Sequence, residues 1–290
     1  MKKINPGIIF AIFAGITYGT NPFFAKYLEA RDFDVDTILF LRYLPATLIL
    51  ALFMIFRKTS FRINLKECAG LVVCGILFVL TSFFLYSSFR YIDVGIASTL
   101  LFVYPVIVAP VMTIFFHEKF TLRTLFCLIL ACGGVGFLCR TSGGELVNMK
   151  GFAAALARAA SYGIYLVSLN KIKWIQKIPS EKQTFYVLCC CALFFFFRVG
   201  CGTALTGTIS LTSAFLVLGL AIIPTVISLG FTSLAIQHVG ATITSIVGAL
   251  EPLTGVCIGL LLFGEKLTIL NAAGIIMILS SVIIIALKKD

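Results

Sequence analysis

The feature that most constrains this chain is a series of apolar runs, each about long enough to cross a lipid bilayer. A membrane-spanning helix needs roughly 20 predominantly apolar residues, and runs of about this length follow one another with only short polar gaps. Because the runs are continuous and do not alternate with polar residues, they favour helices over a β-barrel. Ten spans are predicted, at residues 6–28, 37–56, 68–89, 94–116, 121–139, 151–170, 184–200, 213–236, 240–263 and 269–287.

The composition places this chain in a membrane. Hydrophobic residues make up 60% of the chain and charged residues 12%, whereas a soluble domain carries about 25% charged residues. The net charge of +11 would suit a nucleic acid, but the charges lie in the gaps between apolar runs, so the lipid bilayer is the expected partner and nucleic acid is not. Most of the 10 cysteines lie inside apolar runs as small hydrophobic residues, so no structural disulfide is predicted.

The distribution of Lys and Arg predicts the orientation of the spans, because cytoplasmic loops carry an excess of positive charge. With the N-terminus in the cytoplasm, four such residues fall in the outer loops: Arg31, Arg140, Lys150 and Lys266. Fourteen fall on the inner side: Lys2, Lys3, Arg57, Lys58, Arg62, Lys66, Lys119, Arg123, Lys171, Lys173, Lys177, Lys182, Lys288 and Lys289. A multi-pass protein of the cytoplasmic (inner) membrane, with both termini in the cytoplasm, is therefore predicted.

The sequence also contains an internal repeat. The segments Tyr104-Pro105 and Glu118-Lys119-Phe120-Thr121 recur as Glu251-Pro252 and Glu265-Lys266-Leu267-Thr268, with an offset of 147 for both the proline and the first glutamate of the second motif. The pair Tyr18-Gly19 recurs as Tyr162-Gly163 at an offset of 144. Five spans in each copy bring the second copy into the membrane from the opposite side. Two inverted five-helix repeats are therefore predicted, at residues 1–140 and 141–290.

These duplicated motifs, with Phe40-Leu41-Arg42 in the second predicted span, resemble those of the drug/metabolite transporter superfamily, whose EamA-type members combine two five-helix units. The resemblance covers essentially the whole chain. It implies a ten-helix secondary carrier of metabolites, and several members of the superfamily export amino acids, including aromatic ones. An exporter of small polar or amphipathic metabolites such as amino acids, working by alternating access, is thus the function that the resemblance implies.

One carboxylate lies deep within a predicted span and marks a candidate site. Steps of three and four residues from Glu251 reach Gly248, Thr244 and Gly255, which share one face of a helix with it. A charge in hydrocarbon costs about 3 kcal/mol on insertion scales, so Glu251 should face protein or a watery cavity. A glutamate that is paired locally and only fixes helix packing is the alternative.

Two arginines in predicted spans, Arg42 and Arg158, could pair with Glu251 or bind an anionic group of a substrate. Arg158 shares a helix face with Tyr162 and Tyr165, which gives it the stronger claim to a substrate carboxylate. Arg42 lies nearer the end of its span and could instead reach the outer surface. Backbone carbonyls and hydroxyl groups could also satisfy both arginines. The predicted substrate-binding residues are Tyr18, Asn21, Arg42, Tyr86, Tyr104, Arg158, Tyr162, Tyr165 and Glu251, with helix bends at Pro22, Pro105 and Pro252.

Other functions fit the sequence less well. A multidrug carrier for organic cations, with Glu251 as the attracting carboxylate, is the close alternative, and a membrane-embedded enzyme is a remote one. The two histidines, His117 and His238, lie at predicted span ends without metal-ligand spacing, and there is no P-loop or dinucleotide fingerprint. No enzyme activity, metal or cofactor is therefore predicted. If Glu251 pairs with an arginine in only one access state, transport could be coupled to protons.

A reporter fusion tests the predicted orientation. A reporter that works only in the cytoplasm should be active when joined after Lys289, because the charge bias places the C-terminus inside. A second reporter that works only outside the cell serves as the control at the same position. Activity of the second reporter alone would contradict the orientation.

Overall fold

The computed structural model describes residues 5–89, 91, 104–118, 121–138, 149–208, 210–262 and 269–286, and all regular structure in these ranges is helical. The α-helices are α1 (Pro6–Tyr18), α2 (Asn21–Glu29), α3 (Val35–Phe56), α4 (Leu65–Phe89), α6 (Tyr104–Phe116), α7 (Leu122–Leu138), α8 (Met149–Lys171), α9 (Lys173–Gln176), α10 (Ser180–Arg198), α11 (Leu211–Ala221), α12 (Ser228–Val247), α13 (Leu250–Leu262) and α14 (Ile269–Ala286). A 3₁₀ turn, η1 (Gly200–Gly202), and a π-helical turn, η2 (Ile222–Ile227), complete the order.

Each of the ten predicted spans contains at least part of one of these helices, which confirms the all-helical membrane architecture. Several parts of the prediction lie outside the described residues, namely 94–103 of the fourth span, 119–120 and 264–268 of the repeat motifs, the repeat boundary at 140–141, and the last residues of the fifth, ninth and tenth spans.

The first and ninth predicted spans each break into two helices. The first span breaks after Tyr18, and α2 begins with Pro22 in its first turn. The ninth span breaks between α12 and α13, at Gly248 and Ala249, and Pro252 lies in the first turn of α13. A proline is tolerated there because the first N–H groups of a helix have no intrahelical acceptor. Pro105 is likewise the second residue of α6.

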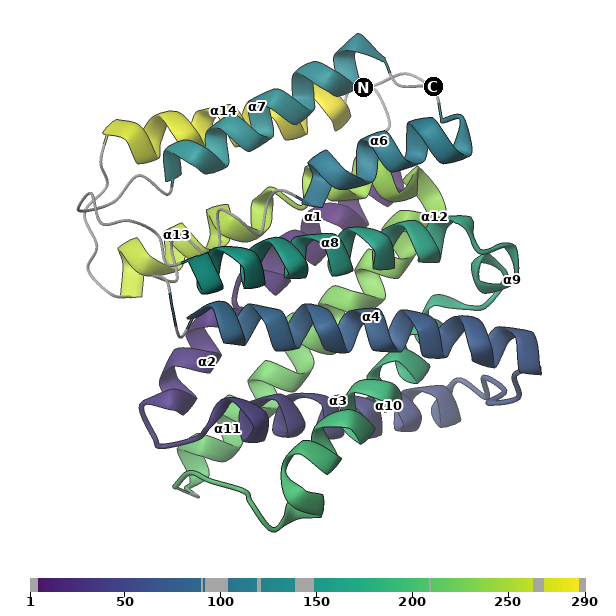
Figure 1. The fold of residues 1–290 in the computed structure, drawn as a ribbon, viewed down its shortest axis with the longest axis vertical. Helices are drawn as coiled ribbons and strands as arrows, with labels where there is room; N and C mark the ends of the chain where they lie inside the picture. The colour runs from purple at the N-terminus through teal and green to yellow at the C-terminus, as the bar shows by residue number, and fades with distance from the viewer. Residues whose placement is uncertain are drawn as a thin grey trace.

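The eighth and ninth spans follow one another without a loop. The secondary structure is continuous through α12, but Gly240 inside it has φ 79° and ψ 170°, and the chain turns sharply there (Figure 1). This backbone conformation is in practice open only to glycine. A single residue therefore separates the two spans, in agreement with the predicted boundaries at 236 and 240.

The π-helical turn η2 interrupts the eighth span between α11 and α12. Pro224 lies in this turn and has no N–H, so the carbonyl of Leu220 loses its α-helical donor. The hydroxyl of Thr225 donates to that carbonyl instead, at 2.8 Å, and Thr225 is fully buried. Turns of this kind are frequent at functional sites.

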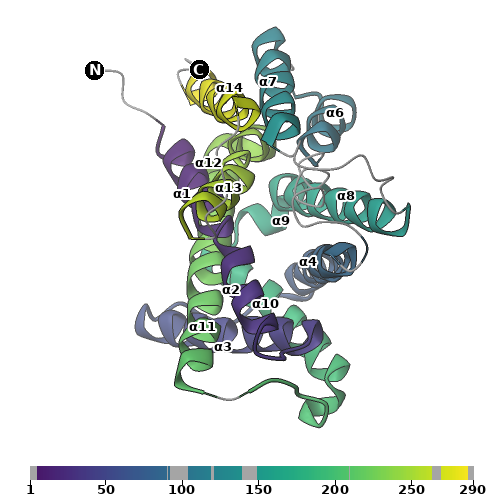
Figure 2. The ribbon, with the colours of Figure 1, turned by 90° about the vertical axis from the view of Figure 1, so that its left-hand side faces the viewer.

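The packing of the helices follows the symmetry expected of two inverted repeats. α3 packs against α10, which are the second and seventh spans, and α7 packs against α14, which are the fifth and tenth. α1 packs against α12, and α4 against α8. If each span is exchanged for its counterpart in the other repeat, the α1–α12 pair becomes the α8–α4 pair. The α3–α10 and α7–α14 pairs stay the same. Figures 1 and 2 show α7 and α14 side by side at one end of the bundle, with α3 and α10 toward the other.

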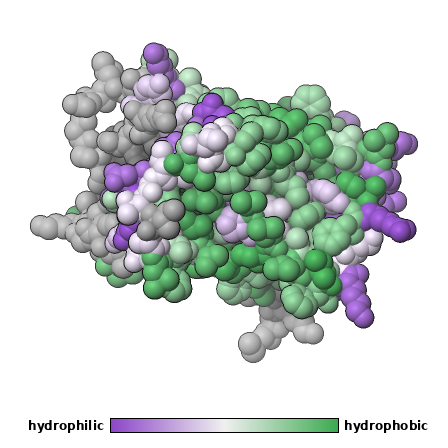
Figure 3. Space-filling model, turned by 90° about the horizontal axis from the view of Figure 1, so that it is seen from below, coloured by the Kyte–Doolittle hydropathy of each residue, from purple (hydrophilic) through white to green (hydrophobic). Residues whose placement is uncertain are grey.

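Large apolar side chains are exposed over the outside of the bundle. They include Leu48, Ile55, Phe115, Leu193 and Ile276. Figure 3 shows one such face, where hydrophobic residues form a broad band and hydrophilic residues gather toward its edges. Within the described ranges, the helical segments that are long and apolar enough to cross a membrane are Pro6–Glu29, Val35–Phe56, Leu65–Ser88, Met149–Lys171 and Leu211–Val247. Lipid is the environment in which such a surface is stable.

Two alanine substitutions test the sharp turn between the eighth and ninth spans. Gly230 and Gly240 both have room for a methyl group, but only Gly240 has a positive φ. A strained backbone costs of order 1–3 kcal/mol, so Gly240→Ala should lower the apparent melting temperature in detergent by several degrees. Gly230→Ala is the matched control and should leave it unchanged or slightly raised, because alanine favours a helix. Equal effects of the two substitutions would contradict the role of Gly240.

Candidate functional site

A buried ion pair joins the sixth and ninth spans. Nη2 of Arg158 on α8 lies 3.6 Å from Oε1 of Glu251 on α13, with 2% of the arginine side chain and 15% of the glutamate side chain exposed. The other guanidinium nitrogens of Arg158, Nε and Nη1, find no hydrogen-bond partner among the described residues. Arg158, for which the sequence predicted a substrate carboxylate, is therefore neutralised by a carboxylate of the chain itself in this conformation.

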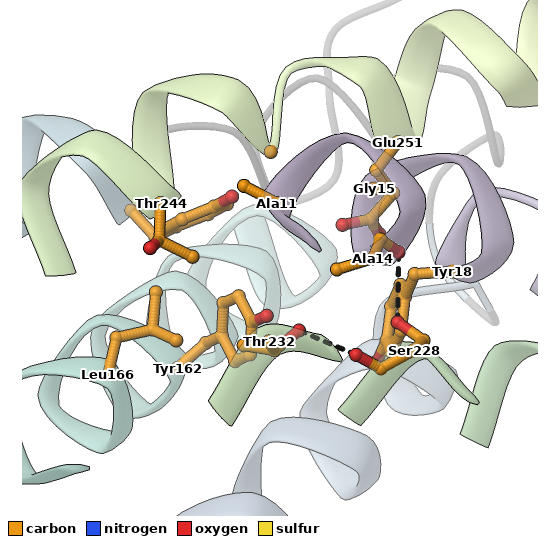
Figure 4. A pocket seen from close by; sticks show the side chains of 12 residues that line it. Ala11, Ala14, Gly15, Tyr18, Tyr162, Leu166, Ser228, Thr232, Thr244 and Glu251 are labelled. Atoms are coloured by element: carbon orange, nitrogen blue, oxygen red, sulfur yellow. Dashed lines mark hydrogen bonds between the residues drawn. The ribbon is translucent and has the colours of Figure 1, made fainter. Parts of the chain in front are cut away.

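Glu251 lines a small cavity between the two repeats. Its walls come from α1, α6, α8, α12 and α13 (Figure 4): Ala11, Ala14, Gly15, Tyr18, Tyr104, Tyr162, Leu166, Ser228, Thr232, Thr244, Gly248 and Glu251. The cavity volume is about 20 Å³, which is room for roughly one water molecule. Pockets that hold small molecules measure several hundred Å³, so this conformation is closed around the site.

The hydroxyl groups in the cavity wall donate their protons to backbone carbonyls, which leaves their oxygens as acceptors for a ligand. Ser228 donates its proton to the carbonyl of Ala14 at 2.9 Å, and Thr232 donates to the carbonyl of Ser228 at 2.9 Å (Figure 4). Thr244 donates to the carbonyl of Gly240 at 2.7 Å. Because each of these hydroxyl protons is donated to a backbone carbonyl, the hydroxyl oxygen can act only as an acceptor toward a ligand. With the Glu251 carboxylate, these oxygens suit a ligand group that donates hydrogen bonds, such as an ammonium.

Four of the predicted site residues, Tyr18, Tyr104, Tyr162 and Glu251, meet in this cavity. The ring of Tyr104 lies edge-on to that of Tyr162, with 4.9 Å between centroids, and the Tyr104 hydroxyl donates to the carbonyl of Ser245 at 3.2 Å. Tyr165 lies outside the wall, where its ring stacks on Tyr162 with centroids 6.0 Å apart.

Ser228 and Thr232 were not predicted from the sequence. Their spacing of one helical turn within a largely apolar span is a signal that could have revealed them.

Arg42 lies apart from the ion pair. It is fully buried on α3, so it does not reach the outer surface. Its Nε donates to the Thr225 hydroxyl at 2.8 Å, and its Nη2 donates to the Pro224 carbonyl at 3.3 Å, both in η2. The guanidinium carbon lies 5.5 Å from the ring centroid of Tyr18 and 5.2 Å from that of Tyr43. Tyr18 therefore lies between Arg42 and the cavity that it helps to line.

The remaining two predicted residues are buried but do not line the cavity. Asn21 is the first residue of α2, 4% exposed, and its side-chain oxygen has no partner among the described residues. Tyr86 lies on α4 and is 1% exposed. The part of the chain that the structure describes contains no group of three or more His, Cys, Asp or Glu side chains that could hold a metal ion.

A pair of substitutions tests the contact between Tyr104 and Gly248, which lies at the break in the ninth span. A methyl group added at Gly248 would overlap the Tyr104 hydroxyl, although the backbone of Gly248 is helical. Gly248→Ala should therefore lower the apparent melting temperature in detergent, whereas Tyr104→Phe should cost only the bond to Ser245, about 1 kcal/mol. The double variant should be more stable than the sum of the two effects predicts. Additive effects would show that the two residues are not in contact.

Known proteins resemble this chain in sequence family and in fold. The sequence model of the EamA-like transporter family matches the chain twice, at residues 5–140 and 149–287. No curated protein matches the chain in sequence. A solved structure described as "Crystal structure of protein" is 13% identical, has a TM-score of 0.83, and covers 98% of this chain and 99% of its own length. At this identity the likeness shows a shared fold.

Proposed function

The chain belongs to the EamA-like transporter family, and from that premise we propose that it exports small polar or amphipathic metabolites such as amino acids by alternating access. It is a multi-pass membrane protein, and the proposal places it in the cytoplasmic membrane with both termini inside and the repeats divided between residues 140 and 141. The observation that carries the proposal is the buried Arg158–Glu251 pair beside a hydroxyl-lined cavity where the two repeats meet. Ionisable groups inside a membrane bundle commonly mark a transport path.

The chemistry of the cavity supports a ligand with an amino group. The Glu251 carboxylate and the oxygens of Ser228, Thr232 and Thr244 are all acceptors, while Arg158, 3.6 Å from Glu251, offers guanidinium donors. The aromatic rings of Tyr18, Tyr104 and Tyr162 offer apolar surface to the body of the same ligand. An amino acid has all three features.

The broken helices supply a place for the access change. A methyl group added at Gly19 would lie 2.5 Å from the backbone oxygen of Glu251, so the breaks in the first and ninth spans meet there in close contact. Separation of these two segments would widen the cavity, because Gly15 and Tyr18 of the first span and Glu251 of the ninth all line it. Discontinuous helices at the repeat interface serve this purpose in secondary transporters.

A carrier of organic cations is the second candidate. One observation favours it, namely that Glu251 lines the cavity while Arg158 does not. Against it stands the distance of 3.6 Å between the two side chains, because the arginine offsets the negative charge that would attract a cation.

Transport by purified protein in proteoliposomes tests the proposal. Vesicles loaded with unlabelled leucine or phenylalanine should exchange it for the labelled amino acid faster than protein-free vesicles do. A quaternary ammonium dye should not compete. Transport of the dye without exchange of either amino acid would favour the cation carrier and contradict the proposed function.

The proposal includes coupling to protons at Glu251. The charged and titratable groups around this carboxylate are Arg158 and Tyr162 on α8, Tyr18 on α1, Tyr104 on α6 and, at longer range, Arg42 on α3. A proton on Glu251 would release Arg158. In the same vesicles, Glu251→Gln should still bind substrate but lose the pH dependence of exchange. Glu181→Gln, at the first turn of α10, is the matched control and should keep it. An active Glu251→Gln protein with unaltered pH dependence would make Glu251 a packing residue.

A further inference from the structure

Arg42 is a buried cation that no acidic side chain neutralises among the described residues. Neither the Arg158–Glu251 pair nor the Arg198–Asp36 pair includes Arg42. Two of its nitrogens donate to neutral oxygens of η2, and the third, Nη1, has no hydrogen-bond partner among the described residues. Neutral acceptors satisfy hydrogen bonds but do not cancel a charge, and Glu251, the carboxylate that interacts with this cation at longer range, forms its close ion pair with Arg158.

The two arginines therefore differ in what they can still bind. A carboxylate brought to Arg158 would meet the negative charge of Glu251 at once, because these side chains are 3.6 Å apart. At Arg42 a carboxylate would meet a guanidinium that lies among Tyr18, Tyr43 and Tyr86 and forms no ion pair among the described residues. An opposite charge at this position would offset the penalty of the buried cation.

The surroundings of Arg42 fit an anion that carries an apolar or aromatic group. The rings of Tyr18 and Tyr43 lie 5.5 Å and 5.2 Å from its guanidinium carbon. Tyr18 also lines the cavity that holds Glu251, so one side chain borders both places. The acceptor groups of the cavity and the guanidinium of Arg42 therefore both lie beside Tyr18.

We infer that Arg42, rather than Arg158, is the anion anchor of the transport path, binding the carboxylate of the transported metabolite while Arg158 neutralises Glu251. This inference rests on the proposed function and names its substrate class as amphipathic carboxylates, with the amino group of an amino acid on the Glu251 side. Arg42 also donates hydrogen bonds to Thr225 and Pro224. A carboxylate that binds at Nη1 and pulls the guanidinium toward itself would first weaken the longer of these bonds, which joins Nη2 to the Pro224 carbonyl at 3.3 Å. Substrate binding would thereby act on the π-helical turn of the eighth span.

Two probes of the same shape test the anchor without requiring transport. 3-Phenylpropionate and 3-phenylpropionamide differ in charge, and their binding to the purified protein in detergent can be followed by calorimetry and by the shift in melting temperature. The wild-type protein should bind the carboxylate at least tenfold more tightly than the amide. Arg42→Gln should abolish this preference, whereas Arg42→Lys should keep it because the charge remains. Equal binding of both probes by the wild-type protein, or an unchanged preference in Arg42→Gln, would overturn the inference.

Two further variants complete the test. Arg198→Gln removes an arginine from the partly exposed pair with Asp36 and should match the wild-type preference. Arg158→Gln should still prefer the carboxylate, and loss of the preference there would overturn the inference in favour of Arg158. This comparison also decides the matter if Arg42→Gln does not purify as a folded protein. Preference for the carboxylate without amino-acid exchange in vesicles would contradict the proposed function and leave the anion anchor intact.

Discussion

The cost of charge inside a hydrocarbon layer governs the interior of this protein. Arg158 and Glu251 can remain buried because each reduces the penalty of the other. The same pressure explains the position of Arg42, which takes up a hydroxyl and a carbonyl from a helix that a proline has interrupted. Buried polar groups thus lie beside a charged side chain or beside a carbonyl of the interrupted helix. The apolar side chains face the lipid.

Much of the fold could be predicted from the sequence, because span length and the distribution of positive charge are direct consequences of the bilayer. The repeated Tyr-Gly pairs and the repeated proline predicted two copies of one unit, and the family match confirms the resemblance. Glu251 stood out because a carboxylate in an apolar run requires a partner. The sequence left open whether Arg42 or Arg158 pairs with that glutamate, and it favoured Arg158 for a substrate carboxylate.

Other parts of the site depend on contacts that spacing does not encode. The role of Thr225 follows from a carbonyl freed by Pro224 and from an arginine 183 positions away, so no local pattern announces it. The break after Tyr18 depends on the close approach of Gly19 to the backbone of Glu251, which is a contact between the two repeats. Ser228 and Thr232 look like ordinary small polar residues of a membrane helix until α1 is placed beside them.

The single-residue turn at Gly240 has a mechanical consequence. A flexible loop between two helices would absorb a displacement of either one, but here the eighth span passes into the ninth with no slack. A rotation at η2 would be carried by the rest of α12 through Gly240 and delivered to the segment that bears Glu251. The eighth and ninth spans would then move together, so that a rotation at the π-helical turn displaces the Glu251 carboxylate.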